Sequence, residues 1–127
     1  LRTQMHPGGI LHGRPHPAAS FGTPSGTKFE NAASWAEVFL FDVVQSTTFA
    51  LALTTDRPIV LIDHGMNRFS NGMRKMLDER CTILEVSRDE RNRIVIDKGE
   101  LADAINAAAA TRPDAMPFRS MFAGVFA

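Results

Sequence analysis

The chain of 127 residues has one cysteine, no tyrosine and no long apolar run. The single cysteine, Cys81, excludes an intramolecular disulfide framework and favours a reducing compartment. No apolar run approaches the roughly 20 residues of a membrane-spanning helix, and the first residues lack the apolar block of a signal peptide. These absences predict a cytoplasmic protein without a membrane span.

The chain also lacks an excess of either charge. Lysine plus arginine and aspartate plus glutamate both number 14. A balanced surface exerts no long-range attraction on nucleic acid or anionic lipid, so neither is expected as a partner. Any site for an anion must then be built locally. The glycine-rich loops of dinucleotide-binding proteins and of P-loop NTPases are absent too, so those two classes are not supported.

Proline, glycine and histidine gather at the start of the chain. Residues 1–28 contain four of the seven prolines, five of the nine glycines and three of the four histidines. They show no helical or alternating apolar period, which predicts a loop-rich segment. Periodic apolar patterns begin at residue 29, so residues 29–127 are predicted to form one α/β domain. Because Leu1 is not an initiator methionine, we expect the chain to be a piece of a longer polypeptide.

Strands and helices are predicted to alternate through the domain. Unbroken apolar runs predict buried strands at residues 38–41, 59–62 and 82–86, and a fourth short strand is expected at residues 94–96, after a charged turn over residues 87–93. Helical spacing fills the intervals, with three expected N-caps: a Ser or Thr of residues 46–48, Ser70 and Asp97. This order predicts a Rossmann-like three-layer αβα sandwich with a mostly parallel sheet of about four strands.

An apolar tail ends the chain. Phe118, Met121, Phe122 and Phe126 recur through its last ten residues. This tail is expected either to form a final helix that packs on the sheet or to contact a partner domain or a second copy of the chain.

Four polar residues, Gln45, Ser46, Thr47 and Thr48, follow the first buried strand at a predicted helix start. A helix start offers unpaired backbone N–H groups and the positive end of a dipole to an anion. If the strands run parallel, the segment lies at their carboxyl ends, where open α/β sheets bind ligands. It therefore predicts a pocket for a phosphate-bearing ligand. The other interpretation is an ordinary N-cap with two hydroxyl neighbours.

Further candidates for the cleft are Asp63, His64 and Arg14. Asp63 and His64 follow the second buried strand and are expected to open into the same crevice; the alternative is a plain turn in which Gly65 supplies a positive φ. His12 and His16 do not predict a metal site, because the prolines and glycine around them prevent the helix that would place them on one face. No metal or cofactor is expected.

Several short motifs together resemble a known family. They are RPHP at 14–17, QSTTFALAL at 45–53, DRPIVLID at 56–63 and ELADAI at 100–105. This order resembles the C-terminal, nucleotide-sugar-binding half of GT-B-type glycosyltransferases, especially the sialyl-, polysialyl- and glycerophosphate transferases that build bacterial surface carbohydrate. The resemblance implies that His16 approaches the donor phosphate, and that Ser46 and Thr47 hold the phosphate or ribose from the helix start. A second His-Pro pair begins at His6, and the sequence does not decide between the two.

The resemblance implies a function by analogy. The chain is expected to bind a nucleotide-sugar donor as half of a glycosyltransferase-like enzyme of surface polysaccharide synthesis. In that family the N-terminal half binds the acceptor and holds the catalytic base, so the catalytic residues are not assigned and the isolated chain is expected to be inactive. Two alternatives remain: a non-catalytic α/β binding or interaction module, and a fragment of a sugar-nucleotide epimerase, for which Asp63 is the one plausible catalytic carboxylate.

Overall fold

The computed structural model describes residues 2–3, 23–24, 31, 33–42, 44–65 and 67–126. Near the start of the chain, β1 (Arg2–Thr3) pairs in parallel with β2 (Thr23–Pro24) as a separate two-stranded sheet. Within these described ranges, no helix is both long and apolar enough to cross a membrane.

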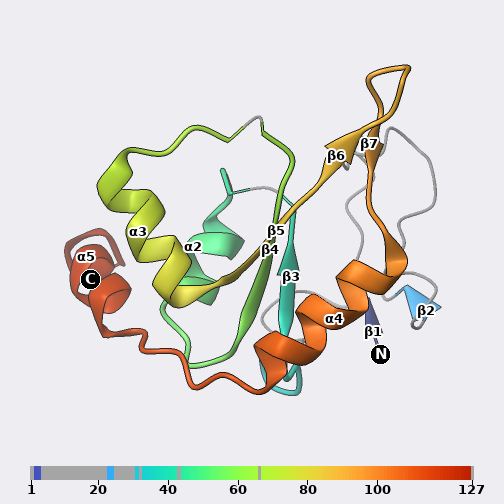
Figure 1. Ribbon diagram of the computed structural model, residues 1–127. Coiled ribbons are helices and arrows are strands. Elements are labelled where there is room, and N and C mark those ends of the chain that lie inside the picture. The colour runs from blue at the N-terminus through green and yellow to red at the C-terminus, as the bar shows by residue number, and fades with distance from the viewer. Residues whose placement is uncertain are drawn as a thin grey trace.

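The centre of the fold is a parallel sheet of three strands in the order β3-β4-β5 (Figure 1). Its strands are β3 (Phe39–Phe41), β4 (Ile59–Asp63) and β5 (Thr82–Glu85). The first four residues of β4 are all buried, as a middle strand covered on both faces requires. The prediction of a mixed α/β fold with parallel strands is confirmed, with three strands in the parallel sheet.

Helices follow the strands at the predicted positions. They are α2 (Thr47–Leu53), α3 (Asn71–Arg80), α4 (Lys98–Ala109) and α5 (Met116–Phe126). Each of the three predicted caps accepts a hydrogen bond from the backbone N–H three residues on, at 3.0 Å for Ser46, 3.2 Å for Ser70 and 2.8 Å for Asp97. All three N-caps are therefore confirmed.

Apolar side chains form two clusters on opposite faces of the sheet. Ile59 and Leu61 of β4 belong to a cluster with buried residues of α2, α3 and α5, whereas Ile62 packs with Leu101 of α4. The alternation follows from the two-residue period of a strand. Figure 1 shows α2, α3 and α5 on one side of the sheet and α4 on the other.

The apolar tail forms α5 and packs on the chain's own core. Phe118 is 1% exposed within the first cluster, and Phe122 packs against that cluster at partial exposure. Met116 and Met121 remain exposed on the same helix. The prediction that the tail is a final helix is therefore confirmed.

One prediction is wrong at the charged segment after β5. Ser87–Arg88 forms a strand, β6, which pairs in antiparallel fashion with β7 (Ile94–Val95) as a hairpin outside the parallel sheet. The sequence predicted a turn throughout residues 87–93, because β6 has no apolar residue. The actual turn is shorter, since the Asp89 carboxylate closes it by accepting hydrogen bonds from the backbone N–H groups of Arg91 and Arg93 at 2.9 and 2.8 Å.

Arg80 at the end of α3 joins α2 to the turn before β4. Its side chain is buried, at 4% exposure, and donates hydrogen bonds to four backbone carbonyls: Nε to Leu53 at 3.1 Å, and Nη2 to Ala52, Thr55 and Arg57 at 3.1, 2.7 and 2.8 Å. Desolvation lowers the pKa of the guanidinium. The carbonyls at the end of α2 carry partial negative charge that compensates for this cost.

We expect Arg80→Ala to destabilise the protein by about 3–5 kcal/mol, because it leaves buried carbonyl groups without donors. Arg80→Lys should recover part of this loss, since an ammonium reaches fewer of the carbonyls. Urea unfolding followed by circular dichroism measures both values. Lys75→Ala, on the exposed face of α3, is the matched control; equal losses for Arg80→Ala and Lys75→Ala would contradict the role given to Arg80.

Cys81 is a buried apolar residue of the first cluster, at 7% exposure, and burial raises the pKa of its thiol to about 12. A thiol reacts through its thiolate, so we expect labelling by a disulfide reagent near pH 8 to be about a thousandfold slower in the folded chain than in urea. Absorbance of the released thiolate reports the rate. Comparable rates in both conditions would show that the thiol is accessible in the native state.

Candidate functional site

A shallow depression of about 360 Å³, called the cavity below, lies at the carboxyl ends of β4 and β5 and is broadly open to solvent. It is lined by Asp63, His64, Gly65, Glu85, Val86 and Arg88. Its volume falls within the range of about 300–1,000 Å³ of small-molecule sites. Ligands of open parallel sheets bind at this edge, outside the carboxyl ends of the strands.

The strand register brings the lining residues together. Asp63 is paired with Glu85 in the sheet, and the backbone N–H of Val86 donates to the Asp63 carbonyl at 3.0 Å. Beyond these residues the chains separate. The segment after β4 turns at Gly65, whose φ is 83°, while the segment after β5 continues into the β6–β7 hairpin. The space between the two departing segments is the cavity.

Asp63 holds the turn and an arginine at the same time. Its Oδ1 accepts a hydrogen bond from the Gly65 backbone N–H at 3.0 Å, and its Oδ2 accepts one from Arg74 Nη1 of α3 at 2.9 Å. Arg74 also forms ion pairs with Asp78 at 3.2 Å and with Glu85 at 3.4 Å. The hydrogen bond to Asp63, followed by that to Asp78, raises the pKa of Arg74. The interpretation as a turn with a positive φ at Gly65 is confirmed, and this turn lines the cavity, whereas a ligand contact by Asp63 or His64 stays a prediction.

His64 ties the ends of two strands together. Its ring is buried, at 9% residue exposure, and its Nε2 lies 3.1 Å from the backbone carbonyl oxygen of Asp42, which follows β3. Because a carbonyl only accepts, Nε2 donates this hydrogen bond. Among the described residues Nδ1 is buried and has no hydrogen-bond partner.

Arg88 is the basic side chain on the cavity wall. Its Nη1 donates to the Asn92 carbonyl at 3.1 Å, and its Nη2 makes a long contact of 3.5 Å with the His64 carbonyl. No carboxylate of the described residues forms an ion pair with it. Sequence reasoning missed Arg88, although Glu85 ends the third apolar strand just as Asp63 ends the second. Asp63 and His64 were chosen because they follow a buried strand. The same criterion, applied to β5, indicates Glu85 and the residues after it.

The polar residues that the sequence singled out lie at the start of α2, outside the cavity lining. Ser46 accepts the capping hydrogen bond of a seven-residue helix from Phe49 N–H. Gln45, Ser46 and Thr47 are exposed and Thr48 is partly buried. The Asp42–His64 contact joins the end of the strand that leads to them with the cavity wall. Three other candidates, His6, Arg14 and His16, lie outside the described residues.

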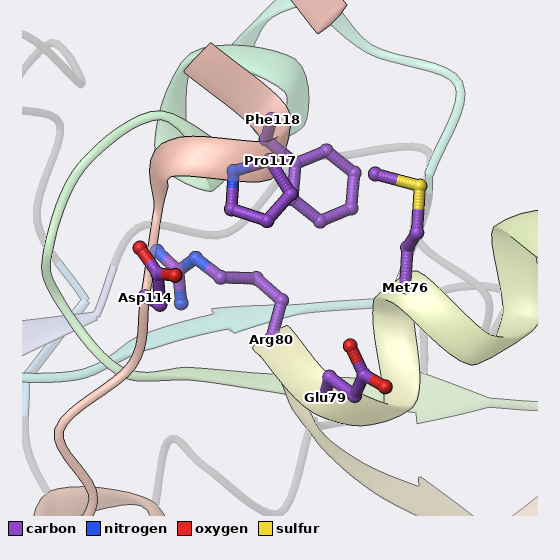
Figure 2. A pocket seen from close by; sticks show the side chains of 6 residues that line it. All are labelled: Met76, Glu79, Arg80, Asp114, Pro117 and Phe118. Carbon is purple, nitrogen blue, oxygen red and sulfur yellow. The ribbon is translucent and has the colours of Figure 1, made fainter. Parts of the chain in front are cut away.

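A smaller cavity of about 80 Å³ lies between α3 and the start of α5 (Figure 2). Figure 2 shows the Arg80 side chain extending from the end of α3 toward the loop that carries Asp114. Four carbonyls of the α2 end and of the turn before β4 already occupy Nε and Nη2 of this guanidinium, and Asp114 accepts from the backbone N–H of Met116, at the start of α5, at 3.0 Å. These groups serve the fold, and the cavity is large enough for water.

Comparison with known proteins adds no relative. No family model, no curated protein and no solved structure matches the chain. In the described ranges of the chain, no group of three or more histidine, cysteine, aspartate or glutamate side chains is arranged to hold a metal ion. The chemistry of the site is therefore argued from the cavity and its lining residues.

We expect Asp63→Asn to lower the free energy of unfolding by about 1–3 kcal/mol, because it removes the charge of a shielded ion pair and disturbs the Gly65 turn. The Asp63 side chain is 15% exposed, whereas that of Asp78, which pairs with the same arginine, is 55% exposed. Asp78→Asn is therefore the matched control and should cost less than about 0.5 kcal/mol. Urea denaturation measures both; equal costs would mean that the shielded pair contributes no more than an exposed one.

Proposed function

We propose that this chain is the nucleotide-sugar-binding half of a glycosyltransferase-like enzyme of surface polysaccharide synthesis. The observation that carries the proposal is the cavity at the carboxyl ends of the adjacent parallel strands β4 and β5. This is the edge at which Rossmann-like sheets bind nucleotides. The motif resemblance and the strand and helix order add support. We further infer that the fold is the three-layer αβα sandwich of such domains, with the two apolar clusters as its two interfaces.

The cavity wall suits a ligand that carries both hydroxyl and phosphate groups. Asp63 and Glu85 offer carboxylate oxygens that accept hydrogen bonds from sugar or ribose hydroxyls, and Arg88 offers N–H donors. A nucleotide sugar combines both kinds of group in one molecule. Its base, ribose, phosphates and sugar can contact two neighbouring parts of one sheet edge.

The start of α2 is the second contact region of this proposal. The Asp42–His64 contact draws the end of β3 toward the cavity wall, and α2 begins a few residues after Asp42. The Ser46 oxygen uses one lone pair in the cap, so its O–H remains a donor. In the proposed complex Ser46 and Thr47 bind the donor phosphate or ribose, as the resemblance implies.

The proposed catalytic contribution of the chain is positioning. Fixed donors at the sheet edge orient the donor and stabilise the charge that develops on the departing phosphate. A missing N-terminal domain or a partner chain supplies the acceptor site and the catalytic base, and the 127-residue chain alone is expected to turn over no substrate.

Both alternatives have less support from the geometry. The epimerase function needs a carboxylate free to abstract a proton, and Asp63 is already paired with Arg74 at 2.9 Å. The interaction-module function requires an apolar tail that is free to contact a partner, whereas Phe118 and Phe122 pack on the chain's own first cluster. Docking of a second copy stays a prediction for the exposed methionines of α5.

The proposal is tested by titrating the folded chain with CMP, UDP, CDP and GDP. We expect at least one of them to bind, with NMR shifts at the amides of residues 63–65 and 85–88. Ser46→Ala combined with Thr47→Ala should weaken that binding about tenfold, the effect of losing about one hydrogen bond to a charged group. Calorimetry gives the affinity. Ser120→Ala on the exposed face of α5 is the control.

Two results would count against the proposal. The absence of any nucleotide binding at millimolar concentration by a well-folded sample would remove donor recognition altogether. Binding with shifts confined to regions away from residues 42–48, 63–65 and 85–88 would move the site elsewhere.

A further inference from the structure

We propose that Arg88 binds the phosphate groups of the ligand in the cavity, held ready for them by the β6–β7 hairpin. This inference deepens the proposed donor binding and rests on it. It adds a phosphate contact on the β5 side of the sheet edge, across β4 from the start of α2.

The ion pairs around the cavity single out Arg88. Its two lining carboxylates, Asp63 and Glu85, both pair with Arg74, at 2.9 and 3.4 Å. In the hairpin, Arg93 pairs with Asp89 at 2.8 Å. Arg88 has no such partner among the described residues, so its charge is left for an anion.

The geometry of Arg88 fits a phosphate. Its two hydrogen bonds go to backbone carbonyls and use fewer N–H groups than a guanidinium carries, so donors remain for a ligand. Planar guanidinium donors match two phosphate oxygens at once, and the resulting charge-assisted bonds are about twice as strong as neutral ones.

The hairpin turn fixes Arg88 on the cavity side. Asp89 closes the turn through three hydrogen bonds, two from the backbone N–H groups of Arg91 and Arg93 and one from Arg93 Nε at 2.8 Å. The backbone bond from Arg93 is the largest cause of the lowered pKa of Asp89. Asn92 adopts a left-handed conformation, with φ of 59°, and its carbonyl accepts from Arg88 Nη1 at 3.1 Å. A side chain held in place before binding loses less entropy when the ligand arrives.

The experiment compares three probes, inorganic pyrophosphate, UDP and uridine, by calorimetry and NMR on the 127-residue chain. We expect Arg88→Gln to weaken pyrophosphate and UDP binding about tenfold to a hundredfold and to leave uridine unchanged. Arg88→Lys keeps the charge but loses the planar fork, so it should weaken binding about threefold to tenfold. Arg91→Gln, which removes the same charge from the tip of the same hairpin, should change binding less than twofold.

Glu85→Gln gives a second test, in which the direction of the change in affinity is decisive. This substitution lies outside the hairpin, so its result does not depend on the integrity of the hairpin. Removing this nearby negative charge should strengthen pyrophosphate binding, by only about twofold to threefold because the Glu85 side chain is exposed and its charge is partly screened. A neutral sugar held through the carboxylate would respond in the opposite direction, with weaker binding.

The outcomes separate this inference from the proposed function. If UDP binds and Arg88→Gln binds it equally well, the Arg88 assignment is wrong while donor binding stands. If pyrophosphate binds through Arg88 but no nucleotide binds, the anion site stands and donor binding fails. Uridine binding as tightly as UDP, or weaker pyrophosphate binding by Glu85→Gln, overturns the phosphate assignment. No binding of any probe overturns both proposals.

Discussion

The burial of one guanidinium, that of Arg80, organises the amino-terminal edge of the sheet. A charged group at 4% exposure is tolerated only because carbonyl oxygens surround it, and these come from the end of α2 and from the turn that leads into β4. Arg119 of α5 adds a hydrogen bond to the Thr54 carbonyl at 2.7 Å. Arg80 thus links α2, α3 and the start of β4, so a change at Arg80 affects these three elements together, and Arg119 ties α5 to the same segment after α2.

The cavity depends on a second arginine of the same helix. Arg74 forms ion pairs with Asp63 at the end of β4 and with Glu85 at the end of β5, and so links the two carboxylates of the cavity lining. The opposite wall belongs to the hairpin, where Asp89 and Asn92 hold Arg88. The carboxylates of the site are therefore held in ion pairs with Arg74, whereas the guanidinium of Arg88 is available to a ligand. This asymmetry is the physical basis on which the two functional proposals rest.

The local parts of this structure could be predicted from the sequence, and the long-range parts could not. Ser70 and Asp97 were recognisable as caps because a cap and its helix are adjacent in the chain. Asp63 was recognised because it ends an apolar run. By contrast, Arg80 contacts the Ala52 carbonyl across 28 residues, and Arg88 owes its place to an antiparallel pair without an apolar pattern. Contacts between segments so far apart leave no periodic trace in the chain, and tertiary packing decides them.

Helix α3 carries both arginines, and this constrains its length. Arg74 contacts the carboxyl ends of the strands and Arg80 contacts the opposite end of the sheet, and the two residues are six positions apart in α3. Each residue advances an α-helix by about 1.5 Å and turns it by about 100°. Insertion or deletion of a single residue between them would rotate one guanidinium away from its acceptors while the other stayed in place. Natural variation in this segment should therefore be restricted to substitutions, with length changes confined to the loops at either end of α3.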